Sequence, residues 1–300
     1  MLQHRDVDQK VLSQWLERYG HWHNPSELAQ HADQAIAELR RTRPERAKQV
    51  SWLCRLEAGM DALLLTDKPE YLDLEEFDAR RRVGIIDALH QFNRWVFAYQ
   101  RFYRILKPMI QRRMQEQGRT VHVLELASGS GAFAMTLARQ AREDGLDVTV
   151  TGSDYFPEHV EACRRKAAAE DSRVQFQVLD AFDLSSVESG AYDLVVVTQS
   201  IHHFSPGQFA LMMHQSLRVA SMAFVGIDGQ RSLGLYAVVP TAGIVMRSAD
   251  FIHDSIITLR KFYTETELEL IGRLAARTDC VQVYTAWPGY SVLNVSAPMA

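Results

Sequence analysis

The stretch that most constrains the fold is VLELASGSGAFA, residues 123–134. An apolar run over 121–126 passes into small residues that include Gly129 and Gly131, and apolar residues at helical spacing follow over 132–140. This pattern predicts a buried parallel strand, a tight turn and a helix. Because glycine has no Cβ, its backbone can adopt positive φ and approach a ligand at the helix N-terminus. The sequence therefore predicts a cradle for a nucleotide-sized ligand.

Further apolar strands with polar carboxyl ends follow at regular intervals. Segments 148–154 (VTVTGSD) and 174–180 (VQFQVLD) each end in an acid, and 192–198 (YDLVVVT) continues into QSIHHF. Segment 222–228 forms a fifth expected strand, and 281–285 with 290–295 suit a closing hairpin. Helical segments separate the first five strands, as parallel sheets require. We therefore expect an α/β fold, a Rossmann-like, seven-stranded, mostly parallel sheet with helices on both faces.

The residues before this sheet are expected to be helical throughout. Residues 1–118 contain few glycines and no convincing alternating strand pattern. We divide the chain into a helical N-terminal extension over 1–70, a helical connecting segment over 71–119 that covers the sheet, and a sheet domain over 120–300. Within the helical part, the segment around Pro44 is expected to break one helix, a second to begin near Asp73, and Pro108 to kink or restart the latter.

Taken in order, these motifs resemble those of the class I S-adenosylmethionine-dependent methyltransferases. Glu125 with the glycine turn is similar to the first motif of that family, Asp154 to its ribose-binding acid, and Asp180 to its adenine site. The resemblance spans about residues 75–300, and HHF after the fourth strand is most similar to small-molecule methyltransferases of the quinone-biosynthesis and natural-product type. It implies S-adenosylmethionine as the cofactor, and a substrate lid over about 229–262.

The resemblance also implies which side chains form the site. The residues expected to bind the cofactor are Glu125, Ala127, Ser128, Gly129, Gly131, Asp154, Tyr155, Asp180, Ala181, Phe182, Thr198 and Gln199. Those expected in the acceptor pocket are Tyr99, Tyr103, Asp228, Arg231 and His253.

Methyl transfer from a sulfonium needs alignment of the reactants and at most one base. His202 and His203 follow the fourth strand, and a histidine titrates near neutral pH, which suits deprotonation of a phenol. We expect His203 to be the base, with His202 as the second candidate; for both, a role confined to ordering the loop stays open. The other histidines are scattered, so no metal site is expected.

Charge and cysteine content limit which partners and which cellular compartment are expected. Residues 120–300 carry 13 Lys and Arg against 20 Asp and Glu, which disfavours nucleic acid as a partner. Cys54, Cys163 and Cys280 lack metal or redox spacing, and no segment approaches the roughly 20 apolar residues of a membrane span. We expect a cytoplasmic protein with no membrane insertion and an aromatic or polyketide-like small molecule as its acceptor. The N-terminal helices are a candidate homodimer contact.

Two other functions remain open at this point. GSGAFA also fits the dinucleotide fingerprint, which would make the chain a nicotinamide-dependent oxidoreductase. A methyltransferase-like fold that binds the cofactor or a partner protein without catalysis is the second alternative.

Overall fold

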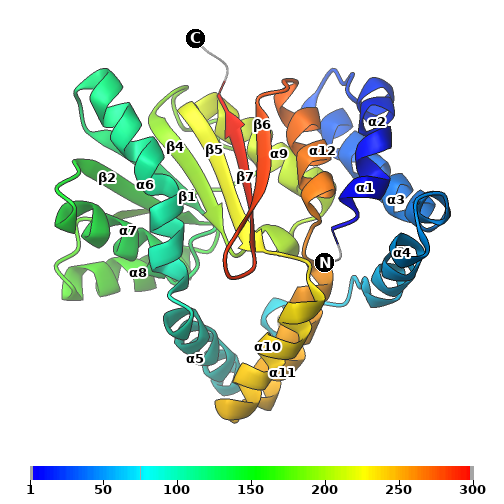
Figure 1. Cartoon of the computed structure of the whole chain (residues 1–300). Coiled ribbons are helices and arrows are strands. Elements are labelled where there is room, and N and C mark those ends of the chain that lie inside the picture. Colours follow the sequence, from blue (N-terminus) through cyan, green and yellow to red (C-terminus); the bar gives the residue numbers. More distant parts are fainter. Residues whose placement is uncertain (1–2, 75, 298–300) are drawn as a thin grey trace.

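The centre of the molecule is a seven-stranded sheet in the order β3-β2-β1-β4-β5-β7-β6 (Figure 1). The computed structural model describes residues 3–74 and 76–297. The strands are β1 Val121–Leu126, β2 Val148–Asp154, β3 Gln175–Val178, β4 Tyr192–Thr198, β5 Ala220–Gly229, β6 Val281–Ala286 and β7 Tyr290–Ser296. The first five pair in parallel, and β7 is antiparallel to both β5 and β6. The predicted Rossmann-like, mostly parallel sheet is confirmed.

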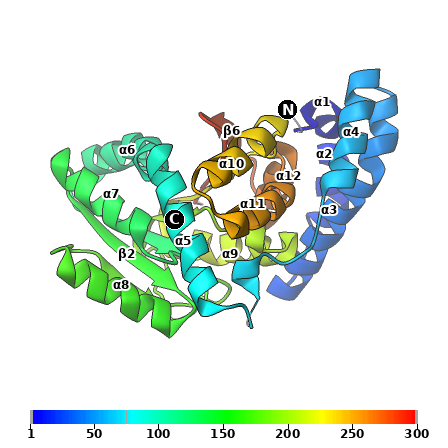
Figure 2. The ribbon, with the colours of Figure 1, turned by 90° about the horizontal axis from the view of Figure 1, so that it is seen from below.

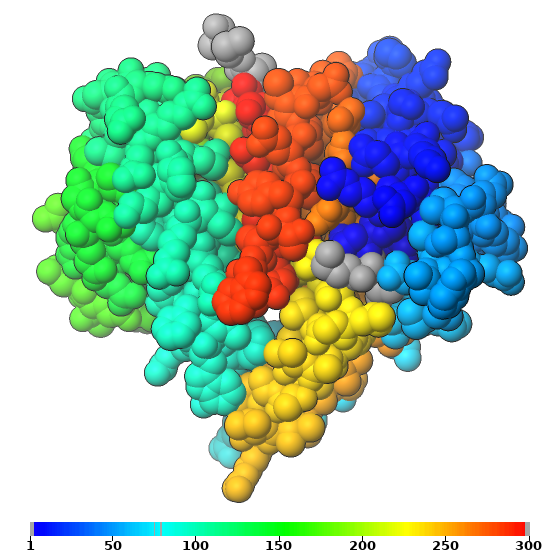
Figure 3. Space-filling model, in the orientation of Figure 1, coloured from blue at the N-terminus to red at the C-terminus, as the bar shows by residue number. Residues whose placement is uncertain are grey.

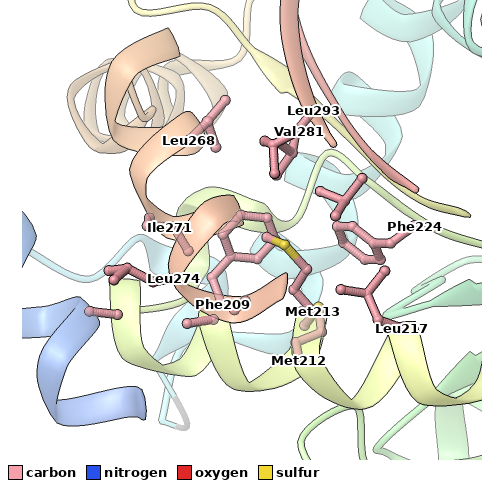
Figure 4. Close-up of a cluster of buried hydrophobic side chains, with 14 of the residues drawn as sticks. Phe209, Met212, Met213, Leu217, Phe224, Leu268, Ile271, Leu274, Val281 and Leu293 are labelled. Atoms are coloured by element: carbon pink, nitrogen blue, oxygen red, sulfur yellow. The ribbon is translucent and has the colours of Figure 1, made fainter. Parts of the chain in front are cut away.

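Each face of the sheet carries its own apolar core. Val121 and Val123 of β1 pack with α6 (Ala98–Gln117), α7 (Ala132–Glu143) and α8 (Pro157–Ala169) on one face. Leu124 and Leu126 point the other way, toward α9 (Pro206–Val219) and α12 (Glu265–Ala276). This is the alternation that a strand buried on both faces requires. Figure 4 shows the second core, where Phe209 and Met213 of α9 lie beside α12.

The N-terminal helices extend this second core and do not form a separate bundle. They are α1 Arg5–Asp8, α2 Leu12–Tyr19, α3 Pro25–Lys48 and α4 Trp52–Leu64, with the 3-10 turn η1 at Gln9–Val11. Apolar residues of α2 and α3 belong to the same buried cluster as α9 and α12. The buried Trp22 donates its indole N–H to the carbonyl of Leu274, at 2.9 Å. The all-helical extension is confirmed, and it is packed on the sheet domain.

A cluster of buried charges also joins the extension to the sheet domain. Arg43 of α3, only 2% exposed, donates to Asp8 of α1 at 2.8 Å, to Asp61 of α4 at 3.0 Å and to Glu267 of α12 at 2.9 Å. Arg231, which follows β5, joins the cluster through Asp61 at 3.2 Å. Removing one member would leave buried charges unpaired, which is strongly destabilising.

A layer of helices covers the carboxyl ends of the parallel strands. It consists of η2 (Tyr71–Asp73), α5 (Ala79–Trp95), α10 (Leu233–Val245) and α11 (Ala249–Lys261). Figures 1 and 2 show α5 opposite the α10–α11 pair, and Figure 3 shows both projecting beyond the sheet as a wedge. Ligands of open parallel sheets bind at this end, so the covering helices enclose the expected site.

Three helix boundaries differ from the sequence-based expectation. Pro44 and Pro108 lie inside α3 and α6, which continue through them. The break comes instead at Phe97, whose φ of 52° separates α5 from α6. In α3, Arg40 and Arg43, in the turn before Pro44, form ion pairs with Glu267 that hold this part of the helix on α12. The helix after residue 70 begins at Ala79, capped by Asp78, and not at Asp73.

None of the helices described is long and apolar enough to cross a membrane.

Candidate active site

The glycine turn between β1 and α7 has the backbone geometry that the sequence predicts. Gly129 and Gly131 have φ of 52° and 67°. A Cβ at Gly131 would lie 2.7 Å from the ring of Phe176, whereas one at Gly129 would meet nothing within 4 Å. Ser128 donates its backbone N–H to the carbonyl of Ser153 at 2.8 Å, which anchors the turn on β2.

A cavity of about 420 Å³ opens over this turn, and we call it the turn cavity. Ala127, Ser128 and Gly129 line it, together with Glu125 of β1 and Thr198 and Gln199 at the end of β4. Its volume lies within the range of small-molecule sites. Six of the twelve residues expected to bind the cofactor therefore surround one cavity.

Glu125 is a buried acid in the wall of the turn cavity. It is 3% exposed and accepts hydrogen bonds from the backbone N–H of Ala134 at 3.1 Å and from the hydroxyl of Thr198 at 2.9 Å. Burial raises the pKa of its carboxyl from 4.5 to about 8, although both hydrogen bonds favour the charged form. A cationic ligand in the cavity would favour the ionised acid.

Asp154, at the end of β2, lies beside the turn cavity. Its carboxylate accepts hydrogen bonds from the backbone N–H of Gly129 at 2.9 Å and of Phe156 at 3.1 Å, and lies 3.3 Å from the ring of His159. Burial opposes ionisation, but the contact with His159 and the two N–H groups lower the pKa of Asp154 below its usual 3.8. The acid is therefore charged and held against the turn, while His159 lines the cavity.

Four other residues expected at the cofactor lie outside the lining of the turn cavity. Tyr155 follows β2 and is 63% exposed. Asp180 follows β3 and accepts a hydrogen bond from the backbone N–H of Phe182 at 2.8 Å, which fixes the loop containing Ala181. The ring of Phe182 packs edge-on against Phe204.

A second cavity, of about 270 Å³, lies beneath the covering helices, and we call it the apolar cavity. Most of its wall consists of aliphatic and aromatic side chains from α5, α10 and α11, including Ile85, Leu89, Phe92, Leu235, Val239, Phe251 and Phe262. Its acidic and histidine lining residues are Glu70, His202, His203, Asp228 and Asp254. The cavity therefore has an apolar body and one polar end.

The two histidines are held by different carboxylates at this polar end. His202 is 9% exposed, and its Nδ1 lies 2.8 Å from Asp228. The Nδ1 of His203 lies 3.1 Å from Asp73, and its side chain is 30% exposed. The Nε2 of His202 lies 3.8 Å from Glu70. A proton shared with Asp228 on Nδ1 leaves Nε2 free to act toward the cavity.

Two hydrogen-bonded amide side chains, Asn93 and Gln199, lie between the two cavities. Gln199 lines both cavities and has a φ of 54°, a conformation that non-glycine residues seldom adopt. Its side chain exchanges two hydrogen bonds with Asn93 of α5, at 2.9 and 3.1 Å. Tyr99 contacts the same Asn93 at 3.2 Å and lines the turn cavity, not the apolar cavity in which it was expected.

Three further residues expected in the acceptor pocket lie elsewhere. Tyr103 is buried against α7 and donates its hydroxyl to Asp144, because its position on α6 faces the sheet. Arg231 is 1% exposed within the buried charge cluster, where Asp61 and Glu267 compensate its charge. His253 stacks on Tyr71 and does not line the apolar cavity. Of that set, Asp228 alone lines the apolar cavity.

Sequence reasoning missed the residues that the covering helices bring to the site. Glu70 lies at the end of the expected N-terminal extension, and Asp254 and Asn93 belong to helices without a motif. Asp254 accepts the backbone N–H groups of Tyr71 at 2.8 Å and Leu72 at 3.3 Å, which holds the segment after Glu70 against α11. For Asn93 and Asp254, the signal in the sequence is a polar residue within an apolar helical stripe; Glu70 has no such signal.

The segment that forms the turn cavity's floor is similar in sequence to a known protein family. Residues 123–221 match the family described as "Methyltransferase domain". Demethylmenaquinone methyltransferase of Deinococcus radiodurans is 30% identical over 83 residues, covering 28% of this chain and 32% of that protein. The enzyme of the same name from Thermus thermophilus is 33% identical over 89 residues, covering 30% and 38%. The chain thus spans about a third of the length of these curated relatives.

The fold as a whole is also found among solved structures. The plantazolicin methyltransferase BpumL in complex with SAH superposes with a TM-score of 0.55 over 74% of this chain and 92% of that one, at 12% sequence identity. At this identity the likeness shows the fold alone.

Proposed function

Because residues 123–221 are a methyltransferase domain within a class I S-adenosylmethionine-dependent methyltransferase fold, we propose that the chain methylates a small molecule held in the apolar cavity. S-Adenosylmethionine is the methyl donor, and it supplies a methyl group activated by the positive charge on sulfur. The observation that carries this proposal is the position of Gln199, which lines both cavities. Donor and acceptor bound in these cavities would meet beside that residue.

The turn cavity fits such a donor. Its floor is a backbone that bends at positive φ, and its wall carries the buried acid Glu125. A carboxylate suits a ligand with a cationic amino acid moiety, and Asp154 is charged at the end of β2, where ribose hydroxyls bind in related folds. We propose that Glu125 and the turn hold the amino acid part, and that Asp154 holds the ribose after exchanging some of its present hydrogen bonds.

The covering helices select the acceptor. The apolar walls contributed by α5, α10 and α11 favour a molecule with an apolar, aromatic or polyketide-like body, and exclude water from the reacting groups. We propose that α10 and α11, within residues 229–262, act as the lid and that α5 forms the opposite wall. Alignment of the reactants between these walls supplies much of the rate.

We propose His202 as the base that removes the acceptor's proton, in place of His203, which the sequence favoured. Asp228 binds Nδ1 of His202 and is itself buried, so the imidazole is fixed with Nε2 available. Burial disfavours the charged ring, but Asp228 and Glu70 outweigh it and raise the pKa of His202 above its usual 6.5, against the opposing charge of Lys261. Turnover should therefore rise with pH through a value above 6.5.

Binding measurements test the cofactor assignment without knowledge of the acceptor. Calorimetry should detect S-adenosylmethionine and S-adenosylhomocysteine binding to the intact chain and no binding of NAD or NADP. Binding of a nicotinamide dinucleotide alone would favour the oxidoreductase. Binding of S-adenosylmethionine without methylation of any member of a broad acceptor library would favour the non-catalytic alternative.

Once an acceptor is found, paired histidine variants test the base. His202→Ala should lower kcat by about 10²- to 10⁴-fold with donor affinity unchanged, because only proton removal is lost. His203→Ala serves as the matched control and should have the smaller effect. A larger loss of kcat in His203→Ala would assign the base to His203 instead. If both variants turn over as fast as the natural protein, the two histidines only order the loop.

A further inference from the structure

The polar end of the apolar cavity is acidic. Among the described residues that line the cavity, Glu70, Asp228 and Asp254 are carboxylates, and none is a lysine or an arginine. The nearest ammonium is that of Lys261, which lies 3.2 Å from Asp73 and 3.6 Å from Glu70 without lining the cavity. An anion placed at this end would meet several negative charges and neither a lysine nor an arginine in the described wall.

Glu70 is the lining carboxylate with an oxygen that accepts no hydrogen bond among the described residues, although Lys261 and His202 lie 3.6 and 3.8 Å from it. It is 3% exposed, and its Oε1 has no hydrogen-bond partner among the described residues. The rest of its side chain is committed, because it accepts the backbone N–H of Asp73 in a reciprocal cap of η2. Asp228, in contrast, already accepts from His202 and from the backbone N–H of Gly229. A buried hydrogen-bond acceptor without a partner destabilises the fold, so a ligand in the cavity that donates a hydrogen bond to Oε1 of Glu70 would be bound favourably.

The charge at this end bears on which nucleophile is methylated. O-Methylation of a phenol passes through a phenolate, and carboxylates within a few ångströms disfavour a second anion. N-Methylation of an amine leaves a positive charge on the product nitrogen, which the same carboxylates stabilise. The structure therefore favours an acceptor that is cationic before and after the reaction.

We propose that the acceptor is a primary or secondary amine with an apolar body, and that Glu70 binds its ammonium group. This inference rests on the proposed methyl transfer and names its substrate class. In this proposal the ammonium N–H donates to Oε1 of Glu70. Nε2 of His202 lies 3.8 Å from the same oxygen and is therefore close to the bound nitrogen. The apolar body of the amine occupies the space between α5 and the α10–α11 pair.

The transfer balances with these groups. The ammonium gives one proton to Nε2 of His202 and becomes a neutral amine. Its lone pair then forms the N–C bond as the C–S bond breaks and the bonding electrons pass to sulfur, so the positive charge moves from sulfur to nitrogen. The products are the methylated ammonium and S-adenosylhomocysteine, and His202 returns its proton to solvent.

A metal ion is the competing occupant of the same place. Glu70, His202 and His203 each offer a ligand atom, and these atoms lie within 4.8 Å of one another. The ammonium of Lys261 lies 3.6 Å from Oε1 of Glu70 and repels any cation at this place, but it repels a divalent ion about twice as strongly as a monovalent ammonium at the same distance. An organic ammonium binds through a directed N–H and needs only Glu70 as its partner.

Binding of matched ligands tests the proposal on the intact chain saturated with S-adenosylhomocysteine. We expect 4-phenylbutylamine to bind about ten- to a hundredfold more tightly than 4-phenylbutanol or 4-butylphenol, as measured by calorimetry. Glu70→Gln should remove this preference and leave S-adenosylhomocysteine affinity unchanged. Glu76→Gln, an exposed acid in the same segment, is the matched control and should retain it.

Several outcomes would overturn the inference. One is equal or tighter binding of the alcohol or the phenol, and another is an amine preference that survives Glu70→Gln. Stoichiometric Zn²⁺ binding that Glu70→Gln abolishes would make the cluster a metal site. Failure to bind S-adenosylhomocysteine at the outset would instead refute the proposed function, so the two failures are distinguishable.

Discussion

Replacing Glu125 with glutamine should change how the stability of the unliganded protein depends on pH. The carboxyl is buried in the wall of the turn cavity, and its pKa rises from 4.5 to about 8. Such a group stabilises the folded state fully below pH 4.5, and this contribution is lost as the pH rises toward 8, because ionisation is easier in the unfolded chain. The rise corresponds to about 5 kcal/mol of unfolding free energy.

Glutamine is a suitable probe because it resembles the protonated acid. Its carbonyl can accept the N–H of Ala134, and its amide can donate to the hydroxyl of Thr198, which can rotate. Between pH 5 and pH 8.5, the unfolding free energy of Glu125→Gln, measured with urea, should therefore rise by about 4 kcal/mol relative to that of the natural protein. Glu158→Gln, an exposed acid at the start of α8, should follow the natural protein at both. Parallel profiles for Glu125→Gln and the natural protein would refute the raised pKa.

The same acid predicts proton release when the donor binds. A cationic ligand beside Glu125 favours the carboxylate and lowers its pKa, so binding near pH 7 should release part of a proton. Calorimetry in phosphate and in Tris would report this as a binding enthalpy that depends on the buffer. The dependence should be absent in Glu125→Gln; if it persists there unchanged, the proton comes from another group.

Three other substitutions probe the cofactor site and the scaffold. Asp154→Ala should weaken S-adenosylhomocysteine binding by about 1.5 to 3 kcal/mol, because the ribose loses a charged partner; unchanged affinity in calorimetry would remove Asp154 from the site. Gly131→Ala should destabilise the fold by about 1 to 3 kcal/mol more than Gly129→Ala. Both variants place alanine at positive φ, but only the new Cβ at position 131 would also clash with the ring of Phe176. Equal melting temperatures of the two variants would contradict this. Arg43→Met should cost about 3 to 5 kcal/mol by leaving buried acids unpaired, whereas the exposed Arg41→Met should cost little; similar urea midpoints for the two would show that the buried cluster is not needed.

The parts of the structure predicted correctly are those that local patterns specify. The turn at Gly129 and Gly131 follows from glycine's freedom at positive φ. The capping boxes that begin α9 and α12, at Ser205 and Thr264, depend on residues three apart. The parallel direction of the first five strands follows from the helical segments between them, and the closing hairpin follows from two strand segments joined by a short turn.

The parts that could not be predicted depend on contacts between distant segments. Pro44 is tolerated inside α3 because Glu267, more than two hundred residues away, binds the arginines beside it. The choice between His202 and His203 depends on Asp228 and Asp73, and only folding shows which histidine each of them binds. A single sequence carries no local signal for such pairs.

Two contacts hold the α10–α11 pair in place, an ion pair to the N-terminal extension and hydrogen bonds to η2. Arg231 precedes α10 and is bound by Asp61 of α4, so the extension fixes the start of the lid. Near the other end, Asp254 of α11 holds the backbone that follows Glu70, which fixes the acid proposed to bind the amine. A lid tethered at both points cannot move without disturbing either the buried charge cluster or the position of Glu70. None of the residues of α1 to α4 lines the apolar cavity, so we propose that the extension affects acceptor binding indirectly, through the position of α10.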